Sequence, residues 1–130
     1  MQNFVADLAG FMHSWEVLNG DSKVDQKITK QYTRDLYNRS KHSVGVAWHH
    51  IWCQENYGNL TDELKNINIP GLFIHGEKDP LISLHAAIKT QKLVPHSRMI
   101  VIPGMGHMFF DATLEKKIAE HLIEHFKKSL

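Results

Sequence analysis

The 130-residue sequence contains a single cysteine, Cys53, and no long apolar run. One cysteine excludes an internal disulfide framework and every metal motif built from several cysteines, so a reducing compartment is the simpler assumption. No stretch approaches the roughly 20 apolar residues that cross a bilayer. The start, MQNFVADLAG, also lacks the basic and apolar regions of a signal peptide. We therefore expect a cytoplasmic protein.

An excess of charge of one sign is also absent, since the formal net charge is +1. Such a chain has no long-range field that would recruit nucleic acid or an acidic membrane surface, and we expect neither partner. Internal repeats and low-complexity tracts are absent too. A hydrophobic fraction of 42% with 22% charged residues is typical of one ordinary globular domain.

The first part of the chain has helical periodicity. Apolar residues at three- and four-residue spacing predict a helix that ends at Asn19 and Gly20: Phe4, Leu8, Phe11, Met12, Trp15 and Leu18. A second helix is predicted by Val24, Ile28, Tyr32 and Leu36, with Asp21, Ser22 or Asp25 as its N-cap. We expect a third helix over residues 43–54.

The second part predicts the order strand, helix, strand, helix. The β-favouring runs are residues 71–75 and 98–102, and Ser83 caps a helix over 83–94 between them. A crossover helix makes the two strands parallel. Thr113 is the predicted cap of a last helix that points these residues inward: Leu114, Ile118, Leu122, Ile123 and Phe126. The predicted fold class is α/β, with a helical segment over 1–60 and a βαβα unit over 61–130.

Ionisable residues follow both predicted strands, in HGEKDPLI and PGMGHMFF. Because the carboxyl ends of parallel strands share one edge of the sheet, Asp79 and His107 should come together there. An aspartate that accepts the imidazole Nδ1 proton fixes the tautomer and leaves Nε2 able to take a proton from a nucleophile. The sequence therefore predicts an acid and a general base.

These motifs resemble the end of an α/β-hydrolase fold, in which a G-x-x-D-P loop gives the acid and a G-x-G-H loop gives the catalytic histidine. Residues 70–128 match that ending throughout. The resemblance implies that Asp79 and His107 belong to a serine hydrolase and that residues 1–60 are its helical lid. GMGH is similar to small-molecule esterases such as aclacinomycin methylesterase, which implies an ester substrate and no cofactor.

The nucleophile elbow of that family, G-x-S-x-G, is missing from the sequence. None of the serines has the flanking glycines: Ser14, Ser22, Ser40, Ser43, Ser83, Ser97 and Ser129. Cys53 fails in the same way, and the oxyanion-hole donors that accompany the elbow are missing as well. We therefore expect the C-terminal part of a hydrolase that is inactive alone. Truncation, proteolysis, a split gene and a degenerate paralogue all remain open as the reason.

Several residues have alternative interpretations. Glu77 is the second candidate for the acid, and His75 is expected to be a core or near-core histidine within its strand. Phe109 and Phe110 are expected to pack, with substrate contact as the lesser alternative. The pair His49 and His50 is interpreted as the edge of an amphipathic helix, or as a lid pocket lining.

Two other functions compete with the enzyme hypothesis. A hydrolase remnant could serve as a non-catalytic interaction module, which the missing nucleophile favours. A metal-binding domain would use some of the ten histidines, with His121 and His125 on one helical face, but no third ligand is evident. Two parallel strands also leave an open sheet edge, so we expect a homo-oligomer or a partner that supplies the missing N-terminal hydrolase segment.

Overall fold

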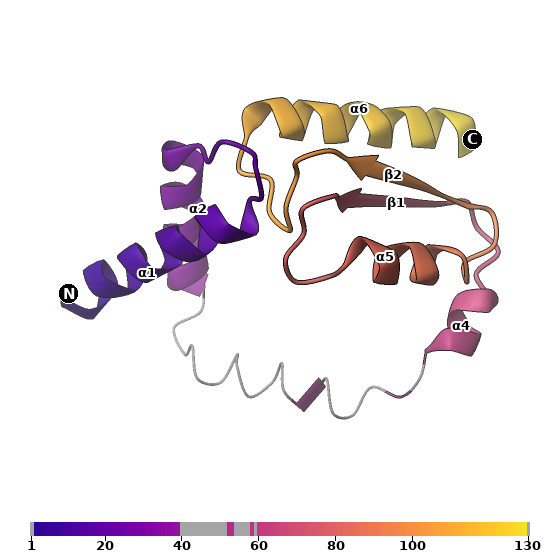
Figure 1. Cartoon of the computed structure of the whole chain (residues 1–130), viewed down its shortest axis with the longest axis horizontal. Helices are drawn as coiled ribbons and strands as arrows, with labels where there is room; N and C mark the ends of the chain where they lie inside the picture. Colours follow the sequence, from indigo (N-terminus) through magenta and orange to yellow (C-terminus); the bar gives the residue numbers. More distant parts are fainter. Residues whose placement is uncertain (1, 40–51, 54–57, 59, 130) are drawn as a thin grey trace.

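The structure is a computed structural model that describes residues 2–39, 52–53, 58 and 60–129. Helices come first and a βαβα unit follows, as predicted (Figure 1). In chain order the elements are α1 (Gln2–Leu18), α2 (Gln26–Arg39), α4 (Thr61–Lys65), β1 (Gly71–Gly76), α5 (Leu84–Gln91), β2 (Ser97–Ile102) and α6 (Ala112–Ser129). Most of the helix predicted over 43–54 lies outside the described residues.

The sheet consists of β1 and β2, which run parallel with Gly71 opposite Ser97 and Gly76 opposite Ile102. Helix α5 connects the strands and contacts both, while α6 contacts β1. The two helices lie on opposite sides of the sheet (Figure 1). Both strands therefore end at the same edge, and the loops that follow them, 77–83 and 103–111, begin side by side.

Side-chain caps fix where α2, α5 and α6 begin. Asp25 is the cap of α2, because its Oδ1 accepts the N–H groups of Lys27 and Ile28 at 2.8 and 3.0 Å. Ser83 caps α5 as predicted, its Oγ accepting the N–H of Ala86 at 3.2 Å.

The predicted cap of α6, Thr113, is wrong. Asp111 caps this helix, with its Oδ1 accepting the N–H groups of Thr113 and Leu114 at 2.8 and 3.0 Å. A carboxylate is favoured here because it satisfies two unpaired N–H groups and faces the positive end of the helix dipole. The helix consequently starts at Ala112.

The predicted inner face of α6 is partly wrong. Leu114 and Ile118 are half-buried as expected, and the half-buried stripe continues through His121 and His125. The other three apolar residues are exposed: Leu122 by 40%, Ile123 by 53% and Phe126 by 62%. A two-stranded sheet is narrow, so it covers one stripe of the helix and leaves the neighbouring stripe in solvent.

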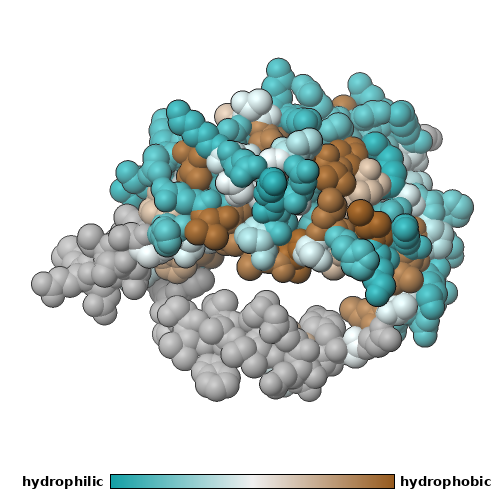
Figure 2. Space-filling model, viewed as in Figure 1, coloured by the Kyte–Doolittle hydropathy of each residue, from teal (hydrophilic) through white to brown (hydrophobic). Residues whose placement is uncertain are grey.

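Trp15 joins the helical segment to the βαβα unit. Its ring lies 5.7 Å from that of Tyr32 and 5.5 Å from that of Phe110, and Phe110 is 6% exposed. The indole Nε1–H donates to Thr33 Oγ1 at 2.8 Å. A small shared core therefore fixes α1 and α2 beside the loop after β2, although groups of hydrophobic residues stay visible on the surface (Figure 2). Among the described residues, no helix is long and apolar enough to span a membrane.

Candidate active site

Three chain segments meet at the carboxyl edge of the sheet: the end of β1, the loop after β2 and the turn after α1. Glycines make this close approach possible. A Cβ on Gly106 would lie 2.2 Å from Leu18 O, one on Gly76 would lie 2.2 Å from Gly106 O, and one on Gly20 would lie 2.7 Å from Gly104 O. Gly20 also has a φ of +68°, which other residues adopt at a cost. Any larger residue at these points would separate the segments.

Asp79 lies in the loop between β1 and α5, and its side chain is 4% exposed. Its Oδ1 accepts the N–H groups of Leu81 and Ile82 at 2.8 and 3.0 Å, which closes the Asp-Pro turn. These bonds fix the carboxylate plane and direct Oδ2 toward the loop after β2.

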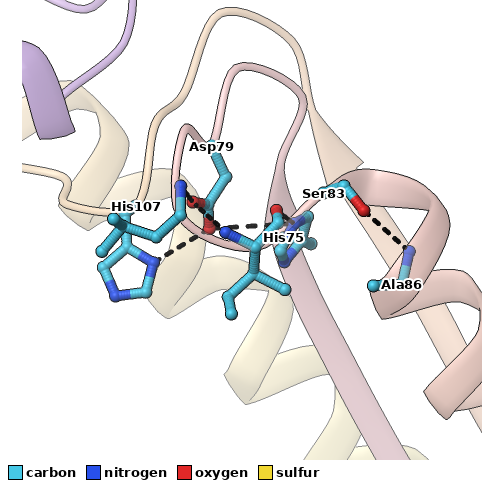
Figure 3. Close-up of polar contacts among 7 residues, drawn as sticks. His75, Asp79, Ser83, Ala86 and His107 are labelled. Atoms are coloured by element: carbon cyan, nitrogen blue, oxygen red, sulfur yellow. Dashed lines mark hydrogen bonds and ion pairs between the residues drawn. The ribbon is translucent and has the colours of Figure 1, made fainter.

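His107 lies opposite that oxygen, with Nδ1 at 2.9 Å from Asp79 Oδ2. The sequence-predicted acid and histidine are thus brought together. Figure 3 shows the ring of His107 with one nitrogen turned toward Asp79 and the other turned away. The His107 side chain is 39% exposed, so the outer nitrogen can be approached from solvent. Against an ionised carboxylate, Nδ1 carries the proton and Nε2 is left unprotonated in the neutral ring.

The electrostatic environment favours the ionised form of Asp79. Burial raises the pKa of this carboxyl, but the backbone N–H groups of Ile82 and Leu81 and the nearby His107 outweigh burial and hold the pKa below its ordinary value of 3.8. Asp79 is therefore a carboxylate across the neutral range and acts as a hydrogen-bond acceptor toward His107.

His75 and Glu77 also border the site. His75 is near the core, with a side chain 13% exposed, and its Nε2 donates to Ile82 O at 3.0 Å. The same atom lies 3.8 Å from Asp79 Oδ2 (Figure 3), a proximity that was not predicted. The sequence feature that could have predicted this proximity is a histidine at the end of a strand, four residues before the aspartate. Glu77, the second candidate acid, accepts instead from Gly104 N–H at 3.3 Å.

The remaining candidates lie elsewhere. Phe110 packs in the shared core, whereas Phe109 is 43% exposed. His121 and His125 are on α6, where the His125 ring contacts Phe126. Over the described part of the chain, no group of three or more histidine, cysteine, aspartate or glutamate side chains gathers as metal ligands would. His49, His50, Ser40 and Ser43 lie outside the described residues.

The described serines bond to backbone groups of their own surroundings. Ser14 donates to Gly10 O and Ser129 to His125 O, each within its helix. Ser97 donates to Val94 O at 2.7 Å, and Ser83 is the helix cap. Ser22 is 3.5 Å from Gly104 O. These contacts are structural and do not include His107.

The family model of the α/β-hydrolase fold matches residues 2–112. The chain belongs to this family. A curated relative, the non-heme chloroperoxidase of Burkholderia pyrrocinia, is 38% identical over 48 residues, which cover 36% of this chain and 17% of that protein.

Solved structures share the fold at low identity. A serine hydrolase involved in carbazole degradation gives a TM-score of 0.71 at 20% identity, covering 92% of this chain and 47% of that one. A bromoperoxidase from Bacillus anthracis gives 0.69 at 20% identity, with 93% and 44% covered. An esterase from Exiguobacterium antarcticum gives 0.67 at 18% identity, with 97% and 47% covered. The chain therefore spans less than half the length of these relatives.

Proposed function

We propose that this chain supplies the acid and the general base of a serine hydrolase that cleaves an ester or a similar acyl bond. The observation that supports this most directly is the 2.9 Å contact between Asp79 Oδ2 and His107 Nδ1 at the carboxyl edge of the sheet. Membership of the α/β-hydrolase family supports the reaction class. The Asp79 side chain is buried and accepts two backbone N–H groups, which supports a role as the orienting carboxylate.

In this mechanism Asp79 accepts the Nδ1 proton and holds the imidazole in one tautomer. Nε2 of His107 then takes the proton of an attacking serine hydroxyl, and the carboxylate stabilises the imidazolium that forms. The imidazolium returns the proton to the leaving alcohol when the tetrahedral intermediate collapses. The acyl group is then bound to the serine oxygen. A water molecule that gives its proton to His107 Nε2 attacks this acyl group and releases it as the acid.

The nucleophile and the oxyanion-hole donors come, in this proposal, from outside these 130 residues, since the sequence carries no G-x-S-x-G. The complete enzyme acts on a small-molecule ester, and its mechanism requires no cofactor. The single cysteine supports a cytoplasmic location. The partner that supplies the nucleophile is a polypeptide that carries the elbow. A further copy of this chain is the alternative partner at the open sheet edge, but it would bring no elbow of its own.

The second candidate function is a non-catalytic interaction module derived from a hydrolase. The exposed apolar stripe of Leu122, Ile123 and Phe126 on α6 favours it. In this alternative, the contact of Asp79 with His107 only maintains the shape of the two loops.

One labelling experiment separates the two functions. This chain is mixed with the polypeptide encoded immediately upstream and treated with a fluorophosphonate probe, which reacts with activated serines. We expect no label on this chain, whether it is alone or in the mixture. In the mixture, the label should be on the elbow serine of the upstream polypeptide. His107→Ala in this chain should slow that labelling by roughly a thousandfold or more.

His85→Ala is the matched control, because His85 is an exposed histidine on α5. Labelling that is equally fast with His107→Ala and with His85→Ala would contradict the enzyme proposal. An upstream region that encodes no elbow would favour the interaction module. Stoichiometric label on a serine of this chain would contradict the assignment of the nucleophile to another polypeptide.

A further inference from the structure

The turn that follows α1 is hydrogen-bonded to the loop that carries His107. Leu18 O accepts the N–H of Met108 at 2.9 Å, and Asn19 O accepts the N–H of Gly106 at 3.2 Å. The two residues that flank His107 are therefore bound by two consecutive residues of the helical segment. Asp21 N–H extends the contact by donating to Gly104 O at 2.8 Å.

The side chain of Asn19 adds a second pair of bonds and is fully buried, at 0% exposure. Its Oδ1 accepts the N–H of Phe110 at 2.8 Å, and its Nδ2 donates to Ser22 O at 2.8 Å. Without this amide, the Phe110 N–H would lose its partner in a buried place, and the partly buried Ser22 carbonyl would lose one as well. Loss of a buried hydrogen bond costs more than loss of a solvated one.

The His107 ring needs such an external anchor. Its side chain is 39% exposed, so packing restrains it weakly, and its position depends on the backbone of residues 106–110. That backbone is bonded to Asn19 at one end through Gly106 and at the other through Phe110. A shift of about 1 Å at either end would take Nδ1 out of hydrogen-bond range of Asp79.

We propose that Asn19 is a positioning residue for His107: it fixes the 106–110 backbone so that the imidazole Nδ1 meets the Asp79 carboxylate. The catalytic meaning of this role rests on the proposed function, but the role itself concerns the state of one ring in this chain. It also assigns the helical segment a task at the site, since α1 ends where the histidine loop must be held.

The test is NMR of the full chain with ¹⁵N-labelled histidine, at a pH where the ring is neutral. In the wild type we expect His107 to show a protonated Nδ1 and an unprotonated Nε2. Asn19→Ala should lose the Nδ1–H resonance and shift the ring toward the Nε2–H tautomer. Asp79→Asn gives the reference pattern of a His107 that lacks its carboxylate.

Thr33→Val is the matched control for stability. Thr33 is 1% exposed and bonds to Trp15 Nε1 and to Thr29 O, all within the helical segment. This variant should unfold at a lower urea concentration than the wild type, while the His107 ring keeps the wild-type signals of a protonated Nδ1 and an unprotonated Nε2. A purely structural role for Asn19 predicts instead that both variants leave the ring unchanged for as long as they are folded.

A folded Asn19→Ala variant with the wild-type His107 pattern would overturn the proposal. If this variant does not fold, hydrogen exchange of the wild type at increasing urea decides. The amide hydrogens of Met108 and Phe110 should then become exchangeable at the same urea concentration, and the Nδ1–H signal of His107 should be lost at that concentration too. Exchange of the two amides at different urea concentrations, or without loss of the His107 signal, would overturn the proposal. Because no measurement here uses the fluorophosphonate probe, failure of one proposal is distinguishable from failure of the other.

Discussion

At the scale of single residues, Asp79 serves the turn and the histidine with different oxygens. Oδ1 is occupied by the N–H groups of Leu81 and Ile82, and Oδ2 by His107. The structural and the catalytic interpretations of an Asp-Pro loop are therefore compatible. The turn holds the carboxylate in the one orientation in which its other oxygen can meet an imidazole.

The pH dependence of stability should report on Asp79. Its pKa is lower in the folded state than the ordinary 3.8, in spite of burial, because of the Ile82 and Leu81 N–H groups and His107. Such a carboxyl stabilises the fold above its unfolded pKa, and the contribution is lost as the pH falls through the lower, folded value. At pH 7 we expect Asp79→Asn to lower the unfolding free energy by about 1–3 kcal/mol.

Urea unfolding at a series of pH values measures this effect. The difference between the wild type and Asp79→Asn should be constant in the neutral range and shrink below about pH 4. Asp62→Asn is the control, since that side chain is 86% exposed and its pairing with Lys65 should contribute less than about 1 kcal/mol. A difference that persists unchanged into strong acid would show that the charge of Asp79 is not what stabilises the loop.

At the scale of elements, local patterns predicted the order of helices and strands and two of the caps. They also predicted that Asp79 and His107 meet, because the position of a loop at the carboxyl edge follows from the strand before it. The short helix α4 was not predicted, although Asp62 and Glu63 in its first turn and Lys65 in its last suit the helix dipole.

The remaining misses depend on contacts between distant parts of the chain. Asn19 looked like an ordinary helix terminator, and its bond to Phe110 joins residues 91 positions apart, which no local pattern reports. The inner face of α6 was misassigned at Leu122, Ile123 and Phe126 because periodicity identifies an apolar stripe but not the width of the sheet that covers it.

The two candidate caps of α6 make a direct comparison. Asp111→Ala removes the acceptor of two N–H groups and should lower the unfolding free energy by about 1 kcal/mol. Thr113→Ala, in the first turn and exposed, should change it by less than about 0.5 kcal/mol. Urea midpoints of the two variants give the measurement. A larger loss for Thr113→Ala would restore Thr113 as the cap.

At the scale of the whole molecule, the described sheet has two strands and leaves polar backbone groups along its outer edges. A pair of strands is marginal as an independent sheet in water unless other elements cover it. Helices α5 and α6 cover the two faces, yet an apolar stripe of α6 stays exposed. The chain also spans 44–47% of the solved structures with the same fold, in which other elements accompany this unit.

These features lead us to expect self-association when the chain is studied without another polypeptide. A dimer or larger oligomer would pair strand edges or cover the stripe of Leu122, Ile123 and Phe126, with an interface above about 1,000 Å². Light scattering at micromolar concentration measures the mass.

Replacing both Ile123 and Phe126 by Glu should shift the mass toward the monomer if the stripe is buried in the contact, because two charges would be desolvated there. Lys117→Glu, at an exposed position of the same helix, should leave the mass unchanged. A well-folded wild-type monomer at that concentration would contradict the expectation, since the open edges and the apolar stripe would then be stable in water.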